Sequence, residues 1–288
     1  MRREEAAAIG TYHSFSLFGF NRDERISIPG TGVRIAPRLG LTAKHVSDEI
    51  FRRLALAEGR RIPRQQTRHE GIEIRAAQQE VGTLNTDLTP WWYVDGAFDS
   101  KLTDISLLKL SPGNEAAKRA DEEHRYLRWS LPPPTVDQRL WAFGFEMVRL
   151  DRESFEPITM VEVEYAASTQ PLKVTAIFEK GRREEPLYVP EILVSDRPLS
   201  MFDYPSFEVL GELAPSMSGG PVFNSDILFG IVSTGWPRTE DEVDGIREAG
   251  GTVALLRPLL EMGEVRLDEN DTPIKLAELI DRGRIRST

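Results

Sequence analysis

The sequence has no cysteine among its 288 residues and only four histidines, and it has no apolar run of about 18 residues. Without cysteine no disulfide can form. Because secreted proteins of this size with catalytic functions usually carry disulfides, the absence favours a reducing compartment. The first fifteen residues, MRREEAAAIGTYHSF, hold no apolar core of signal-peptide length. We therefore expect a cytoplasmic protein with no transmembrane helix and no membrane partner.

Metal and phosphate motifs are missing as well. There is no paired-cysteine or HExxH pattern and no GxxxxGK[ST] loop, so we expect no catalytic metal and no cofactor. Basic residues are outnumbered, with 36 Lys and Arg against 46 Asp and Glu, a net charge of −10 and a pI of about 5.1. Because binding to phosphate backbones needs clustered Lys and Arg, we expect no nucleic-acid partner.

The sequence does contain many short apolar segments broken by glycine and proline. Some, such as VEVEY and GIEIR, alternate apolar and polar residues, which is typical of half-buried strands. The segments predicted as strands are Ser14–Phe18, Gly32–Ala36, Gly71–Arg75, Asp104–Leu110, Leu140–Phe145, Met160–Tyr165, Leu172–Phe178, Ile192–Ser195, Phe207–Leu210 and Ile227–Ser233. This pattern indicates an all-β sandwich or barrel.

Helical signals are few. The segment Asp48–Ala57 follows Ser47, a good N-cap residue, and ends near Gly59. The other segments predicted as helices are Asn114–Leu127, Thr252–Met262 and Pro273–Gly283.

Three consecutive prolines, Pro132–Pro134, mark the clearest internal boundary. They cannot continue a helix or a strand ladder, so they predict a stiff extended connector. We therefore divide the chain into a first β-domain at residues 1–130, a second at residues 131–262 and a C-terminal tail at residues 263–288.

Three motifs hold residues with chemical potential. His45 lies in LTAKHV after GTGVRIAP, Asp104 is the second residue of TDISLLKL, and Ser218 lies in PSMSGGPVF. Each has a structural explanation on its own: a core or capping histidine, a turn aspartate, a tight turn. However, the three residues occur in the order His, Asp, Ser, and each lies beside a predicted strand. Three separate structural roles do not explain this combination.

The chemistry of a serine nucleophile explains the combination. A serine hydroxyl reacts poorly at neutral pH unless a base lies within hydrogen-bond reach, and imidazole titrates in the right range. The imidazole in turn needs a carboxylate that holds its tautomer and stabilises its cation. We therefore predict Ser218 as nucleophile, His45 as general base and then acid, and Asp104 as the residue that orients His45.

The segments LTAKHV, TDISLLKL, SMSGGPVF and GIVSTGW resemble the trypsin/chymotrypsin family of serine proteases, and in particular its cysteine-free bacterial members. The resemblance spans roughly residues 28–260. It implies two antiparallel six-stranded β-barrels with a few short helices and the helical tail. His45 and Asp104 would come from the N-terminal barrel and Ser218 from the C-terminal barrel.

The resemblance also implies an oxyanion hole made by the backbone N–H groups of Ser216 and Ser218. The family usually has glycine at the position of Ser216, and a Cβ there restricts the peptide. We therefore expect a resting hole that is misformed and that becomes ordered when a substrate or partner binds. Met217 stands where members activated by N-terminal cleavage have aspartate, so this activation is not expected.

By the same resemblance, Gly230–Gly235 is the strand that lines the specificity pocket. Ser233 would support the triad aspartate, and Thr234 and Gly235 would pair with the substrate backbone by β-augmentation. Glu212 falls where the pocket floor lies and would favour a basic substrate side chain. Equally, Glu212 could point to solvent in a remodelled loop.

The predicted function is therefore a serine endopeptidase that hydrolyses peptide bonds in peptide or protein substrates through an acyl-enzyme. The alternative is a catalytically silent protease-like domain that binds a peptide or protein partner. Cytosolic family members without appended domains are often parts of regulated bacterial systems, which suggests a regulatory partner protein.

Overall fold

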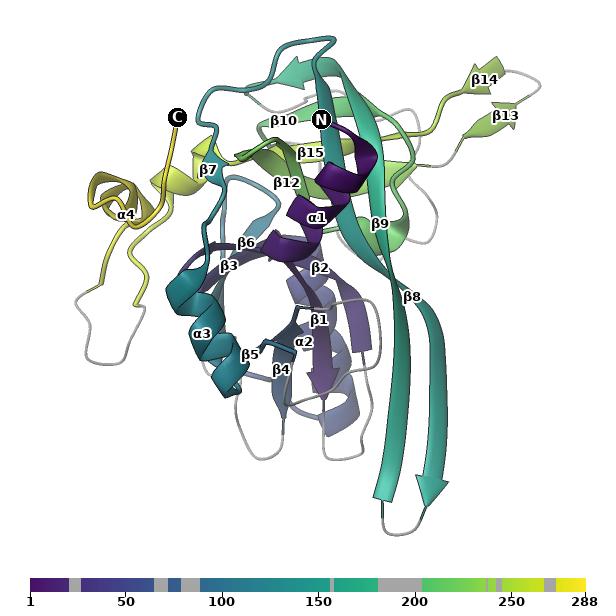
Figure 1. The fold of residues 1–288 in the computed structure, drawn as a ribbon, viewed down its shortest axis with the longest axis vertical. Coiled ribbons are helices and arrows are strands. Elements are labelled where there is room, and N and C mark those ends of the chain that lie inside the picture. Colours follow the sequence, from purple (N-terminus) through teal and green to yellow (C-terminus); the bar gives the residue numbers. More distant parts are fainter. Residues whose placement is uncertain are drawn as a thin grey trace.

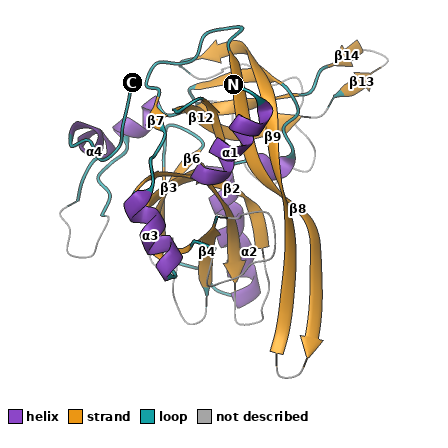
Figure 2. Cartoon of the chain, in the orientation of Figure 1, coloured by secondary structure: helices purple, strands orange, loops and turns teal. Residues whose placement is uncertain are grey.

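The computed structural model describes residues 1–20, 27–64, 72–78, 89–155, 158–180, 204–236, 238–241, 245–266 and 273–288 (Figure 1). Strands predominate in this part of the chain, and Figure 2 shows them in two main groups with short helices beside them. The predicted strand Ile192–Ser195 and the residue Gly71 lie outside the described residues.

The first group of strands is a closed antiparallel barrel. Its strands are β1 (Ser14–Phe20), β2 (Ser27–Ala36), β3 (Leu39–Ala43), β4 (Glu73–Ala77), β5 (Trp91–Asp99) and β6 (Ile105–Pro112). They follow the order β1-β2-β3-β6-β5-β4, and pairing of β4 with β1 closes the ring. Phe15, Leu41 and Trp92 are fully buried in the core that this barrel shares with neighbouring elements.

The second group closes into a ring of its own. Its strands are β8 (Arg139–Phe155), β9 (Ile158–Phe178), β10 (Ser206–Leu210), β11 (Pro221–Asn224), β12 (Ile227–Trp236) and β15 (Gly250–Leu255). The order is β11-β8-β9-β10-β15-β12, and β12 pairs with β11 to close it. Two six-stranded antiparallel barrels form the chymotrypsin-like fold, so the predicted fold class is confirmed.

Short strands extend this second sheet and lie beside it. β7 (Arg128–Trp129) pairs in parallel with the start of β12, and β13 (Thr239–Asp241) pairs with β14 (Gly245–Arg247). The proline run lies in irregular chain between β7 and β8. The domain limits at residues 130 and 262 stay predictions.

The strands β8 and β9 are longer than the sequence indicates. The segments 160–165 and 172–178 are one strand, because the pairing of β9 with β8 continues through the residues between them. The resulting hairpin runs well past the second barrel (Figure 1).

The helix α1 (Arg3–His13) was not anticipated from the sequence. Alanine-rich and closed at its start by a capping box between Arg2 and Glu5, it packs against β8 and β9. Gly10 makes this contact close: a Cβ there would lie 2.2 Å from the ring of Phe143. The helix thus fastens the N-terminus to the second barrel, although the strand after it belongs to the first.

Two predicted helices are present with different limits. The helix α2 (Lys44–Glu58) starts earlier than expected, with Ala43 at its N-cap, so the assignment of Ser47 as N-cap is wrong. Its end at Gly59, which has φ 65°, is as expected. The helix α3 (Glu115–Glu123) is capped by the Asn114 side chain and stops before Leu127.

The helix predicted over Thr252–Met262 is wrong. Its first part belongs to β15, whose six residues are all buried because the strand pairs with both β10 and β12. The rest is a short 3₁₀ helix, η3 (Arg257–Glu261). In the tail, α4 (Leu276–Asp281) ends before Gly283, which has φ 67°.

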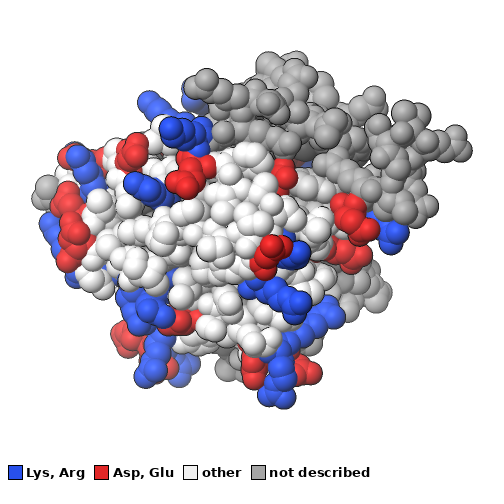
Figure 3. Space-filling model, turned by 90° about the horizontal axis from the view of Figure 1, so that it is seen from above, with Lys and Arg blue, Asp and Glu red and all other residues white. Residues whose placement is uncertain are grey.

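The surface carries charges of both signs. On the face shown in Figure 3, Lys and Arg side chains lie intermixed with Asp and Glu side chains around a largely uncharged centre. In the part of the chain that the structure describes, no helix combines the length and apolar character needed to cross a bilayer.

Candidate active site

The pairing of β3 with β6 brings His45 and Asp104 together. Ala43 lies opposite Ile105 in this pairing, so the residues just beyond the two strand ends are neighbours. The backbone N–H of Lys44 donates to the carbonyl of Asp104 at 3.1 Å. His45 therefore stands in the first turn of α2, directly above the aspartate.

The carboxylate of Asp104 holds His45 at two points. One oxygen, Oδ1, accepts the backbone N–H of His45 at 3.1 Å, and Oδ2 lies 2.8 Å from the ring atom Nδ1. A carboxylate only accepts, so Nδ1 carries the proton and Nε2 is the basic nitrogen. Burial lowers the pKa of His45, but the charges of Asp104 and Asp48 and the hydrogen bond to Asp104 outweigh it and raise that pKa above 6.5.

A second hydroxyl group supports the same carboxylate. Ser233 is fully buried, and its Oγ donates to Oδ2 of Asp104 at 2.5 Å. The hydroxyl of Tyr204 donates in turn to Ser233 Oγ at 2.5 Å. Burial and the charge of Asp104 raise the pKa of Tyr204 well above its usual value, so this hydroxyl keeps its proton. The support predicted for Ser233 is present in the geometry, and Tyr204 extends it.

Sequence reasoning missed Tyr204. It precedes Pro205 in a segment without periodicity, and neither its spacing nor its neighbours resemble a motif. Only the folded second barrel brings it against Ser233, 29 residues further along the chain. No signal in the sequence could have identified it.

Ser218 reaches the barrel interface on a tight turn. Its carbonyl accepts the backbone N–H of Thr31 at 2.9 Å. Gly219 follows with φ 86°, and a Cβ there would lie 2.0 Å from the carbonyl oxygen of Thr31 and 2.3 Å from Thr42 Oγ1. Glycine is therefore required at this position on both backbone and contact grounds.

The hydroxyl of Ser218 is directed at Ser233. It donates to the Ser233 carbonyl at 3.2 Å, and the described residues show no hydrogen bond between Ser218 and His45. Ser218 is 8% exposed, and the side chain of His45 is 28% exposed. Ser233 thus links the three predicted residues, because its carbonyl accepts from Ser218 and its hydroxyl donates to Asp104, which holds His45.

The residues before Ser218 form a 3₁₀ turn, η2 (Pro215–Met217), in which the N–H of Met217 donates to the carbonyl of Ala214 at 2.9 Å. Such a turn is right-handed, so Ser216 has an ordinary backbone conformation. The carbonyl of Ser216 accepts the hydroxyl of Thr31 at 3.1 Å, and its own Oγ is buried without a partner. Met217 is fully buried in the second barrel core.

The remaining predicted residues lie on the neighbouring strand and loop. Thr234 and Gly235 pair with β15 through Thr252 and Gly251, and Gly235 is exposed. Glu212 is exposed as well. Its neighbour Leu213 contacts Gly235 closely, because a Cβ on Gly235 would lie 2.5 Å from the Leu213 carbonyl oxygen. The three predicted residues are therefore close together. Among the described residues, no group of three or more metal-ligating side chains occurs.

The fold and this site place the chain among two-barrel, chymotrypsin-like structures. No protein-family model matches the sequence, and no curated protein matches it. Solved structures with a similar fold include proteases.

Three of these structures illustrate the likeness. The active form of the Rv3671c protease from M. tuberculosis is 11% identical, with 92% of this chain and 88% of that chain covered and a TM-score of 0.47. The HtrA-type protease AlgW with a decapeptide is 12% identical, with 89% and 65% covered and a TM-score of 0.48. Neuropsin from mouse brain is 15% identical, with 86% and 90% covered and a TM-score of 0.45. Such low identities do not transfer an activity.

Proposed function

We propose that this protein is a serine endopeptidase that cleaves peptide bonds through an acyl-enzyme, with Ser218, His45 and Asp104 as its triad. One observation supports this most strongly. Ser218 from the second barrel and His45 with Asp104 from the first belong to one hydrogen-bonded set that is joined by Ser233.

The proposed reaction begins with rotation of the Ser218 hydroxyl from the Ser233 carbonyl towards His45. Nε2 of His45 accepts the hydroxyl proton while Oγ attacks the substrate carbonyl carbon. Asp104 stabilises the imidazolium, which then gives its proton to the leaving amine. Water, activated by the same nitrogen, hydrolyses the acyl-enzyme and restores Ser218.

The oxyanion of the tetrahedral intermediate would be bound by the backbone N–H groups of Ser216 and Ser218. Each such donor is worth about 3–4 kcal/mol in the barrier. The 3₁₀ turn before Ser218 supports the proposal that the resting hole needs rearrangement, because the peptide that carries the Ser216 N–H lies within this turn. A substrate or a regulatory protein would supply the energy for that change.

A second candidate is a silent protease-like domain that binds a peptide or protein. It is favoured by one observation, the hydrogen bond from the Ser218 hydroxyl to Ser233 rather than to His45. The exposed edge of β12 near Gly235 would bind a peptide strand in either case.

Labelling with a fluorophosphonate separates these two functions. We expect a covalent adduct on Ser218, found by mass spectrometry of the digested protein. The adduct should be absent from Ser218→Ala and unchanged in Ser168→Ala, a serine of β9 outside the site. If the folded wild-type protein gives no adduct over a long incubation, with and without peptide substrates, the enzyme proposal is wrong and the binding function takes its place.

A further inference from the structure

A pocket of about 820 Å³ lies between the first barrel and the C-terminal segment, away from Ser218. Its walls come from the turn between β2 and β3 at residues 36–39, from residues 124–126 after α3, and from residues 274–286 around α4. Figure 1 shows α3 and α4 on the same side of the molecule. Two backbone hydrogen bonds hold the C-terminal wall in place. The carbonyl of Trp129 accepts the N–H of Thr288 at 2.8 Å, and the backbone N–H of Trp129 donates to the carbonyl of Arg286 at 2.7 Å.

The pocket is strongly basic. Its lining includes five arginines, and none of the described residues that line it is an aspartate or glutamate. The arginines are Arg38, Arg125, Arg282, Arg284 and Arg286. This arrangement stands out in a chain with 46 acidic and 36 basic residues. We call it the arginine pocket.

Few of these charges are neutralised within the protein. Arg282 pairs with Glu278 at 3.3 Å. Among the described residues, Arg125, Arg284 and Arg286 have no ion-pair partner within 4 Å, and Asp226, the carboxylate whose pKa the charge of Arg286 helps to lower, is already paired with Arg128. Several unpaired guanidinium groups around one cavity repel one another, and an anion in the cavity would relieve that repulsion.

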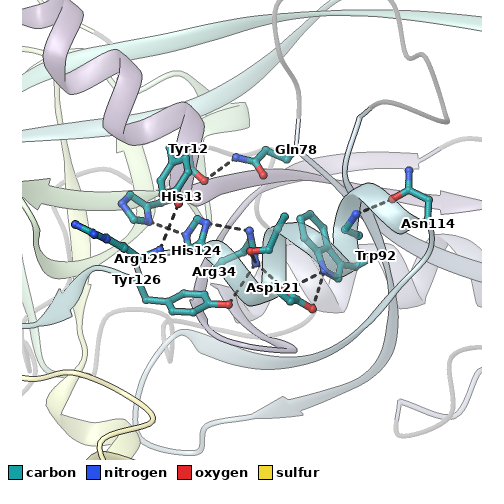
Figure 4. A network of polar contacts seen from close by, with 12 residues as sticks. Tyr12, His13, Arg34, Gln78, Trp92, Asn114, Asp121, His124, Arg125 and Tyr126 are labelled. Atoms are coloured by element: carbon teal, nitrogen blue, oxygen red, sulfur yellow. Dashed lines mark hydrogen bonds and ion pairs between the residues drawn. The ribbon is translucent and has the colours of Figure 1, made fainter.

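A buried cation lies behind the pocket wall (Figure 4). Arg34 is 1% exposed and lies 4.4 Å from the ring centroid of Trp92. It donates to Asp121 at 2.7 Å and to Tyr126 Oη at 3.3 Å. Asp121, the carboxylate behind this wall, is therefore engaged mainly by Arg34, and its charge also acts on Arg38.

The histidine in the wall stays neutral. Because a guanidinium only donates, Arg34 donates to Nδ1 of His124 at 3.0 Å, and His124 Nε2 then donates to Nδ1 of His13 at 3.0 Å. Burial and the charge of Arg34 lower the pKa of His124 to about 2. His124 therefore adds no charge to the wall, and neither does Tyr126, whose pKa is raised by burial to about 12.

We propose that the arginine pocket binds a small molecule that carries a polyphosphate group, with phosphate oxygens paired to Arg125, Arg284 and Arg286. The planar guanidinium fork matches phosphate geometry and binds it in bidentate fashion. The pocket volume lies in the range of small-molecule sites, roughly 300–1,000 Å³. The partly exposed Tyr126 ring and the small exposed part of Ile274 offer apolar surface to the remainder of the ligand.

Isothermal titration calorimetry at low ionic strength tests this with three probes: orthophosphate, inorganic triphosphate and ATP. We expect triphosphate to bind at least about tenfold more tightly than orthophosphate, since more guanidinium contacts are made. Equal affinity for triphosphate and ATP would assign recognition to the phosphates alone. Tighter binding of ATP would show that the apolar surface contributes too. Both results support the proposal.

Matched variants locate the site. Arg284→Ala with Arg286→Ala should weaken triphosphate binding about tenfold or more. Arg52→Ala with Arg53→Ala removes the same charge from α2, where both arginines pair with Glu49, and should leave the affinity unchanged. Circular dichroism confirms folding. Arg125→Ala, at an exposed side chain, is the replacement if the double variant unfolds.

Two results would overturn the proposal. One is equal loss of affinity in the pocket and α2 variants, which would mean a response to overall charge only. The other is absence of triphosphate binding by the folded wild-type protein. If an oligoglutamate peptide binds in place of triphosphate, with the same sensitivity to the pocket variants, the pocket recognises acidic peptides and the phosphate assignment is wrong.

Discussion

Replacing Tyr204 with phenylalanine tests the hydrogen-bonded chain that supports the proposed triad. The hydroxyl of Tyr204 donates to Ser233, and Ser233 donates to Asp104, at 2.5 Å in each case. The direction is fixed, because a carboxylate only accepts. Tyr204→Phe therefore removes one buried donor while it keeps the ring that packs in the core.

The expected cost in stability is the net value of one hydrogen bond, about 1–1.5 kcal/mol. The effect on the site acts through Asp104. Without the donor from Tyr204, the Ser233 hydroxyl polarises less and donates more weakly to the carboxylate. Asp104 then attracts the imidazolium of His45 more strongly, so the pKa of His45 should rise further above its already raised value.

The assay is the rate of fluorophosphonate labelling as a function of pH. His45 must be neutral to act as base, so labelling is lost as pH falls through its raised pKa, and the acid midpoint should lie above 6.5. In Tyr204→Phe this midpoint should move to higher pH, and the plateau rate should fall about threefold to tenfold, which corresponds to roughly 0.7–1.4 kcal/mol.

The control is Tyr12→Phe, at a tyrosine that is 43% exposed and whose hydroxyl accepts the backbone N–H of Arg125. It should leave the pH profile of labelling unchanged. A folded Tyr204→Phe protein with wild-type rate and wild-type acid midpoint would refute the support of Asp104 by Tyr204. A lower rate with an unmoved midpoint would assign Tyr204 a packing role only.

Three other predictions concern the site and the buried histidines. Asp104→Asn should slow labelling about 10⁴-fold, because His45 loses its orienting acceptor; a loss below about tenfold would contradict the triad. Ser216→Gly should speed labelling, since glycine allows the peptide to turn into the hole, at a cost of about 0.5–1 kcal/mol in denaturant-measured stability; slower labelling would show that the hole is already formed. Burial and the Arg34 charge lower the pKa of His13 to about 4 and of His124 to about 2. The unfolded chain therefore binds more protons than the folded protein below pH 6.5. The free energy of unfolding should then be lower at pH 5 than at neutral pH by about 2 kcal/mol per histidine, as urea unfolding would measure. An unchanged urea midpoint would contradict the neutral histidine pair.

The barrel fold could be predicted because its signals are local. Short segments predicted as strands, such as GVRIA and FEVL, lie in β2 and β10, and the motifs around His45 and Ser218 gave the order of the predicted site residues. The pairing of β3 with β6 then made His45 and Asp104 neighbours. Residues that lie at strand ends of a closed barrel can be matched in this way without further information.

The errors arose where tertiary contacts override local preference. In the segment that starts at Thr252, the apolar residues of LLRPLLEM have helical spacing. The first residues of the segment nevertheless form a strand, because they pair with β10 and β12. The α1 helix is short and only weakly amphipathic, and its place depends on the contact of Gly10 with Phe143. Neither partner is near in sequence, so neither outcome could be read from local composition.

The turn before Ser218 is the clearest case of such a long-range effect. Thr31, in the first barrel, donates its hydroxyl to the Ser216 carbonyl and accepts the N–H of Phe145, while its own N–H donates to the carbonyl of Ser218. Thr31 thus bonds to the carbonyls of both Ser216 and Ser218 and connects this turn to β8. The peptide that carries the Ser216 N–H lies in the 3₁₀ turn, directly before the peptide whose carbonyl accepts the Thr31 hydroxyl. The interface between the barrels therefore joins the residues of the proposed triad and also holds the turn beside the proposed hole, so we expect the docking of the barrels to influence how readily that hole forms.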